Sequence, residues 1–170
     1  MEKIFNRLEP FFNDCYRRIS VREYSRITKI SPPTASNILN SYVKQGILKK
    51  EKDRIYHLFY ANTDNWLFID LTRMYWRKSL EKIKLIEKIE SEYKMPIIIL
   101  FGSISKGELT NNSDIDIAIF SPSISKIDYS QYEIKLKRKI QVFTFNSLEE
   151  VKNKELLKNI ISGYKIKGEY

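Results

Sequence analysis

Leu100-Phe101-Gly102-Ser103 is followed, ten residues later, by Asp114-Ile115-Asp116. Apolar runs flank this stretch, at residues 97–101 before the glycine and at residues 115–120 after the first acid. Each run is short and rich in β-branched residues, which favours a buried strand. The sequence therefore predicts a strand, a Gly-Ser turn and a second strand that opens with two acids.

The residues at the turn and at the second strand favour a site for phosphate and metal. Gly102 lets the chain turn sharply, and Ser103 would open a short helix whose hydroxyl and first amides face a phosphate. Because strand side chains alternate, Asp114 and Asp116 lie on one face. Two neighbouring carboxylates repel each other unless a cation such as Mg²⁺ lies between them. We expect nucleotide binding at Gly102 and Ser103, and metal binding at Asp114 and Asp116.

These residues resemble the signature of the polymerase-β-like minimal nucleotidyltransferase domain. The resemblance implies a mixed β-sheet with flanking helices, a nucleoside triphosphate at the Gly-Ser turn, and Mg²⁺ or Mn²⁺ ions held by three carboxylates. Asp114 and Asp116 would be two of the catalytic, metal-binding acids. In the family, the third acid lies on a neighbouring strand, and residues 139–145 are the candidate for that strand. The position that should carry the acid is occupied here by Gln141.

Gln141 leaves open whether this domain is an active enzyme. An amide can orient a hydroxyl, but it can neither balance a dication nor accept a proton at neutral pH. Asp128 and Glu133 precede the strand, and we expect both in solvent. Three functions remain open: transfer of a nucleoside monophosphate to a hydroxyl, binding of a nucleotide through one metal, and use of the fold only as an interaction module.

The N-terminal residues predict three short helices and a hairpin. An apolar helical spacing covers the first dozen residues, and Ser20 is placed to cap a second helix that ends near Lys29. On this second helix, Val21, Tyr24 and Ile27 are expected to face the core. Ser31 caps a third helix that reaches Gln45 and stops at Gly46. Two strands, at residues 47–48 and 55–58, would then enclose a charged tip, which completes a winged helix-turn-helix.

Charge supports a nucleic-acid partner for this region. The chain has 170 residues and a formal net charge of +9; residues 1–60 hold 12 Lys and Arg against 6 Asp and Glu, and the remainder holds 18 against 15. A basic excess of this kind favours double-stranded DNA, although a solvated surface or a protein-binding domain would have the same charge. The predicted DNA-binding residues are Thr34, Ser36, Asn37, Lys44, Lys49, Lys50, Lys52 and Arg54.

A helical connector is expected between the two halves. It would begin at Asn62 or Thr63, kink or break within residues 75–79, and end before Pro96. Its aromatic residues predict surface buried against a domain or a second subunit. A homodimer would let two winged domains read a two-fold symmetric DNA site, and the sequence does not decide this. Beyond residues 148–161, a predicted helix, the tail is either a closing strand or a loose end.

The predicted fold class is α/β in the broad sense of a protein that mixes helices and strands (α+β). It comprises a winged helix-turn-helix at 1–61, a helical connector at 62–94 and a minimal nucleotidyltransferase-like domain at 95–170. This order is similar to a group of archaeal winged-helix transcriptional regulators that carry a nucleotidyltransferase domain. The resemblance implies a DNA-binding regulator whose second domain binds nucleotide and Mg²⁺. The alternatives are an active nucleotidyltransferase and an antitoxin of the minimal nucleotidyltransferase type.

The cysteine content and the hydropathy pattern bear on location. Cys15 is the single cysteine, which excludes a disulfide within the chain and fits a reducing compartment. The first residues lack an apolar signal core, and no run reaches the roughly 18 residues needed to cross a bilayer. We therefore expect a soluble cytoplasmic protein with no membrane partner.

Overall fold

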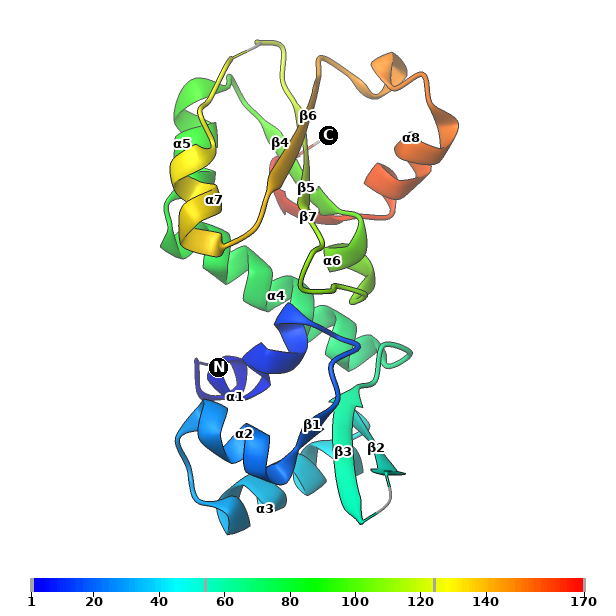
Figure 1. The fold of residues 1–170 in the computed structure, drawn as a ribbon. Coiled ribbons are helices and arrows are strands. Elements are labelled where there is room, and N and C mark those ends of the chain that lie inside the picture. The colour runs from blue at the N-terminus through cyan, green and yellow to red at the C-terminus, as the bar shows by residue number, and fades with distance from the viewer. Residues whose placement is uncertain (1, 54, 124, 170) are drawn as a thin grey trace. The chain divides into compact units, whose positions relative to one another are not determined.

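The chain divides into two compact units. A computed structural model describes residues 2–53, 55–123 and 125–169 (Figure 1). The first unit is Met1–Thr72 with Gly107–Asn111, and the second is Arg73–Lys106 with Asn112–Tyr170. The domain boundaries drawn from the sequence, after residues 61 and 94, stay predictions.

The first unit confirms the predicted order of helices and hairpin. Three antiparallel strands form its sheet in the order β1-β3-β2. The elements are α1 Glu2–Asn13, β1 Ile19–Ser20, α2 Val21–Thr28, α3 Pro32–Lys44, β2 Leu48–Asp53 and β3 Tyr56–Ala61.

The predicted caps fix the ends of α2 and α3. The Ser20 hydroxyl accepts a hydrogen bond from the amide of Glu23, and Ser31 accepts one from Thr34. One prediction for α2 was wrong, because Ile27 is 41% exposed. The buried face of α2 is centred between Tyr24 and Ser25, which lie about 100° apart on the helix, so Ile27 points away from it.

The sequence had suggested that the basic residues of the hairpin lie at its tip. The structure instead places them along strand β2. Lys49 pairs with Tyr60, Lys50 with Phe59, and Lys52 with His57. Residues opposite one another share a face, so Lys50 and Lys52 lie on the side of the buried Phe59 and Lys49 lies on the other side. The strand continues through the charged residues because they reach solvent while Leu48 and Phe59 stay buried. Arg54 lies outside the described residues.

The second unit is built on a mixed four-stranded sheet in the order β6-β5-β4-β7. The β5–β6 pair is parallel and the other pairs are antiparallel, which confirms the predicted α/β class with flanking helices. The tail forms an edge strand rather than a loose end. The elements are α4 Trp66–Lys82, which begins in the first unit, then α5 Leu85–Glu92, β4 Ile97–Phe101, α6 Ser103–Lys106, β5 Ile115–Phe120, α7 Ser130–Leu136, β6 Ile140–Phe145, the 3₁₀ turn η1 Leu148–Glu150, α8 Lys154–Ile161 and β7 Tyr164–Lys167.

Helices cover both faces of this sheet. Helices α5 and α7 lie on one face and α8 on the other (Figure 1). The core on the α8 side joins alternate residues of β4 and β5 to the α8 segment, namely Ile99, Phe101, Ala118, Phe120, Val151 and Ile160. Asp116 is two residues before Ala118, so it lies on this same face, at the end of an apolar core.

The connector differs from its prediction. Helix α4 runs unbroken through residues 75–79, and the break comes at Lys84, whose backbone is left-handed with φ 63°. Trp76 and Leu80 are buried one turn apart, which keeps a single face of α4 against the core across the predicted kink. Trp66 is 71% exposed and does not bury the surface expected of it. Within the described residues, no helix has the length and apolar character needed to cross a membrane.

Replacing Ile160 by Ala tests the packing of α8. Ile160 is fully buried in the α8-side core, so Ile160→Ala should lower the free energy of unfolding by about 2–4 kcal/mol. Its neighbour Ile161 is 58% exposed, and Ile161→Ala should cost about 0.5 kcal/mol or less. Urea unfolding of both variants measures the difference; equal losses would show that α8 does not pack as described.

Candidate functional site

The predicted acids lie where three strands meet in register. Asp116 of β5 pairs with Phe101 of β4 on one side and with Gln141 of β6 on the other. Paired residues share a face, so these three side chains stand in one row across the sheet. Asp114 comes two residues earlier, just before β5, and is exposed. The structure therefore brings together the acids and Gln141 as the sequence predicted, while their roles remain predictions.

The Gly-Ser turn is pressed against Asp116. Gly102 has a left-handed backbone with φ +68°, and a Cβ added there would lie 2.1 Å from Oδ2 of Asp116. No other residue fits this position without moving the carboxylate. The Ser105 hydroxyl donates to the carbonyl of Gly102 at 2.9 Å, and Ser103 is the first residue of α6, as predicted.

Burial and a neighbouring negative charge both act on Asp116. Burial, and then the charge of Asp114, raise the pKa of Asp116 from 3.8 to about 6. Within the described residues, no ion pair or side-chain hydrogen bond engages Ser103, Asp114, Asp116 or Gln141. The half-buried Asp116 and the exposed Asp114, with no counter-charge among the described residues, fit a hard divalent cation. The described residues contain no group of three or more His, Cys, Asp or Glu placed to hold a metal, so this site offers two carboxylates.

Other acids near β6 are engaged elsewhere. Glu133 is half-buried, and its Oε1 accepts the amide of Ile140 at 2.9 Å, so the expectation that it lies in solvent was wrong. Glu133 is drawn from solvent because β6 is an edge strand that begins with a free backbone amide, and a carboxylate on α7 can reach that amide. Asp128 is exposed, as expected, and accepts both the amide and the hydroxyl of Ser130.

Two arginines near the site were missed by the sequence analysis. Nη1 of Arg138 donates to the carbonyl of Ser113 at 2.7 Å, and Nε of Arg73 donates to the carbonyl of Ser105 at 2.7 Å. Arg138 lies in a run of basic residues that looks solvated. Its one signal is the period-two spacing with Ile140 and Val142, which extends the apolar face of the strand by one position.

The predicted DNA-binding residues of α3 differ in exposure. Thr34, Asn37 and Lys44 are exposed. Ser36 is half-buried, and its carbonyl and hydroxyl both accept Nδ2 of Asn40, at 2.8 and 3.3 Å. Ser36 is therefore less available to an external partner than its neighbours.

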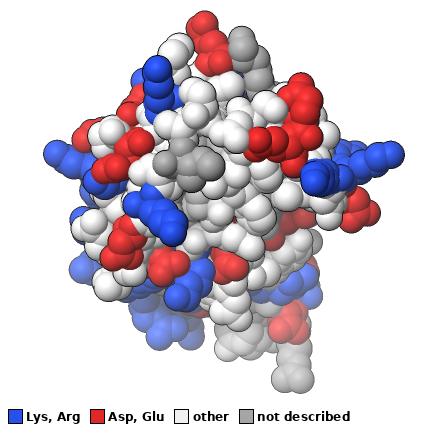
Figure 2. Space-filling model, turned by 90° about the horizontal axis from the view of Figure 1, so that it is seen from above, with Lys and Arg blue, Asp and Glu red and all other residues white. Residues whose placement is uncertain are grey.

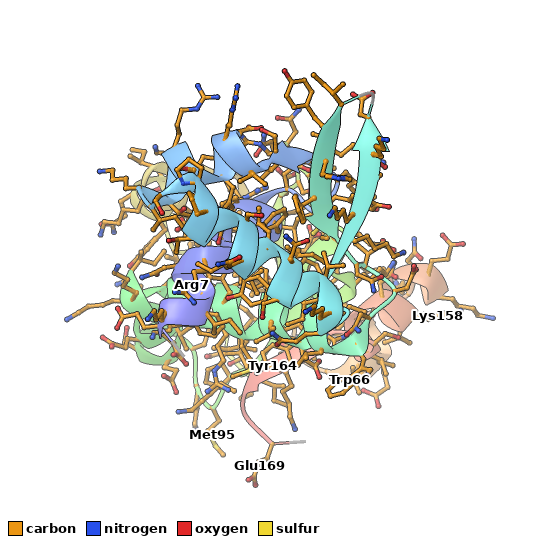
Figure 3. The ribbon with its side chains drawn as sticks, turned by 90° about the horizontal axis from the view of Figure 1, so that it is seen from below. Arg7, Trp66, Met95, Lys158, Tyr164 and Glu169 are labelled. Carbon is orange, nitrogen blue, oxygen red and sulfur yellow. The ribbon has the colours of Figure 1, made fainter. Side chains whose placement is uncertain are left out.

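The lysines of β2 lie on opposite faces of the hairpin and have different partners. Nζ of Lys50 lies 3.4 Å from Oδ1 of Asn40, which joins one face of the hairpin to α3, and Figure 3 shows the two elements side by side. Lys49, on the opposite face, pairs with Asp64 at 2.5 Å. Lys52 is exposed on the α3 side of the strand.

The pKa of Asp116 makes a prediction about stability. Because the folded pKa of about 6 exceeds the ordinary 3.8, the folded chain holds this proton more tightly, and the free energy of unfolding should fall as pH rises between those values. Asp116→Asn should remove this fall in stability with pH, because an amide does not titrate. After allowance for solvent screening, we expect the variant to be more stable by about 1 kcal/mol near pH 7.5, and no more stable near pH 4. Thermal unfolding across this pH range checks the prediction; equal stability near neutral pH would contradict it.

Comparison with known proteins identifies the second unit. The family model described as "Polymerase beta, Nucleotidyltransferase" matches residues 82–167, about half of the chain. The matched range contains the Gly-Ser turn, both acids and Gln141. No curated protein and no solved structure matches the chain. The chain therefore belongs to the polymerase beta nucleotidyltransferase family.

Proposed function

We propose that the second unit binds a nucleoside triphosphate together with one divalent cation, Mg²⁺ or Mn²⁺. The observation that carries the proposal is the acid pair itself: Asp116 lies against the Gly102 turn, the charge of Asp114 acts on it, and neither acid has a counter-charge among the described residues. Family membership supports a nucleotide as the ligand.

Each residue at the turn has a role in this proposal. Asp114 and Asp116 would hold the cation, which, when bound, would offset their charge and that of the phosphates. Gly102 has no side chain and leaves the backbone accessible to a phosphate oxygen, and the Ser103 hydroxyl would donate to it. The exposed amide of Gln141 lies beside Asp116 and can hydrogen-bond a ligand hydroxyl.

The same residues argue for binding with slow or no transfer. Transfer to an acceptor hydroxyl needs a group that takes up its proton, and an amide cannot do this at neutral pH. Glu133 and Asp128, the neighbouring acids, are bonded to Ile140 and Ser130 respectively. The family is named for nucleotidyl transfer, so this reaction is the second candidate function. Release of labelled pyrophosphate from a triphosphate would favour it.

We further propose that the first unit binds duplex DNA as a winged helix-turn-helix, which would make the chain a transcriptional regulator. The support is the order α2, turn, α3 and hairpin, in a region with a net charge of +6. Thr34, Asn37 and Lys44 would contact DNA from α3, and Lys50 and Lys52 would meet phosphates from the adjoining face of the hairpin.

The surface charge of the second unit is different. Figure 2 shows a face of that unit on which Lys and Arg alternate with Asp and Glu around a largely uncharged centre. Since non-specific DNA affinity comes from clustered positive charge, this face is a poor candidate for the DNA interface. The charge excess of residues 1–60 favours DNA contacts through the first unit.

Metal binding can be measured directly by titrating the chain with Mn²⁺ and recording the free ion by electron paramagnetic resonance. We expect one bound ion near pH 7.5 and an affinity about tenfold lower near pH 5, where most of Asp116 is protonated. Asp116→Asn should abolish binding, and Asp128→Asn, at an acid bonded to Ser130, is the matched control. Binding that survives Asp116→Asn would overturn the proposal.

DNA binding can be tested with two neighbouring lysines on opposite faces of β2. Lys50→Gln should weaken duplex binding and reduce the slope of log affinity against log salt by about one. Lys49→Gln should leave both nearly unchanged, because Lys49 lies away from α3 and pairs with Asp64. Fluorescence anisotropy of labelled duplex at several salt concentrations makes the comparison. Equal effects, or no duplex binding at all, would contradict the proposed interface.

A further inference from the structure

Arg138 is the only charged residue that is buried in the described part of the chain, with 9% of its surface exposed. Burying a guanidinium costs free energy unless polar partners replace water, so its position needs an explanation. Cζ lies 5.1 Å from the ring centroid of Trp76, in a cation–π contact, and Nη1 donates to the carbonyl of Ser113 at 2.7 Å. Trp76 is itself 2% exposed.

The segment that carries Arg138 holds both flanks of Asp114. On one side, the Arg138 side chain binds the carbonyl of Ser113; on the other, the carbonyl of Lys139 accepts the amide of Ile115 at 2.9 Å. The segment is fixed in turn by α7, because the amide of Arg138 donates to the carbonyl of Glu133 at 3.2 Å. Asp114 itself is exposed and precedes the first residue of β5, and these two bonds hold the chain on either side of it.

We propose that Arg138 is a positioning residue that fixes Asp114 for divalent-cation binding, an inference that rests on the proposed function of the second unit. Trp76 prevents the guanidinium from turning away, and the guanidinium fixes the Ser113 carbonyl. The peptide plane that leads into Asp114 is thereby held in one orientation. An exposed carboxylate on a free loop would lose more conformational entropy on binding a cation than one whose backbone is already fixed.

The experiment is a double-mutant cycle read by Mn²⁺ affinity. Arg138→Met keeps the length and apolar contact of the side chain but cannot donate, and we expect it to weaken Mn²⁺ binding about tenfold, the size seen when groups that orient ligands are removed. Arg138→Lys keeps a cation that can donate to the same carbonyl, so it should lose less. In an Asp114→Asn background, titrated to higher Mn²⁺ concentrations so that the weak binding left to Asp116 can be measured, Arg138→Met should have no further effect, because Arg138 acts through Asp114.

A readout without metal separates positioning from general stability. Amide exchange at Ile115 should be faster in Arg138→Met than in Ile160→Val, a conservative core variant that leaves the Ser113 contact intact. The inference is overturned if Arg138→Met binds Mn²⁺ as the natural chain does, or if its loss persists in the Asp114→Asn background. If the natural chain binds no Mn²⁺, the proposed function fails and this inference fails with it.

Discussion

The site depends on the space that Gly102 leaves for the carboxylate of Asp116. A Cβ at residue 102 would lie 2.1 Å from Oδ2, so any other residue there would displace the carboxylate and would also have to adopt a left-handed backbone. The pairing of β4 with β5 places Asp116 beside the buried Phe101, at the end of the apolar core on the α8 side. Burial and the nearby Asp114 then raise its pKa to about 6. The fold thus holds an acid in a place that is unfavourable for its charged form, which a bound cation would relieve.

Much of this arrangement could be predicted from the sequence because strand alternation is a strict rule. The runs at 97–101 and 115–120 predicted two strands at their observed bounds, and alternation placed Asp114 and Asp116 on one face. The position of Gln141 beside them was implied by the family resemblance, and the pairing of β5 with β6 places it opposite Asp116. Local hydrogen-bonding chemistry predicted the caps at Ser20 and Ser31 equally well. These features depend on neighbours in the chain or on the next strand, which a single sequence records directly.

Features that depend on distant packing could not be predicted. The break at Lys84, rather than within residues 75–79, follows from the burial of Trp76 and Leu80 against residues far along the chain. Glu133 was expected in solvent and instead caps the free amide of Ile140. Arg138 sits in a basic run that gives little indication of burial, yet it is packed against Trp76 and bonded to Ser113. In each case a tertiary contact outweighs the local preference of the residue.

We propose that the second unit holds one divalent cation between Asp114 and Asp116, because Gln141 supplies no third charge. A crystal structure of the chain soaked with Mn²⁺ and a non-hydrolysable triphosphate would test this, since anomalous scattering locates each ion. We expect a single Mn²⁺ bound by both carboxylates, with the phosphates at the Gly102 turn. A second Mn²⁺ beside Gln141, or none within reach of Asp116, would contradict it.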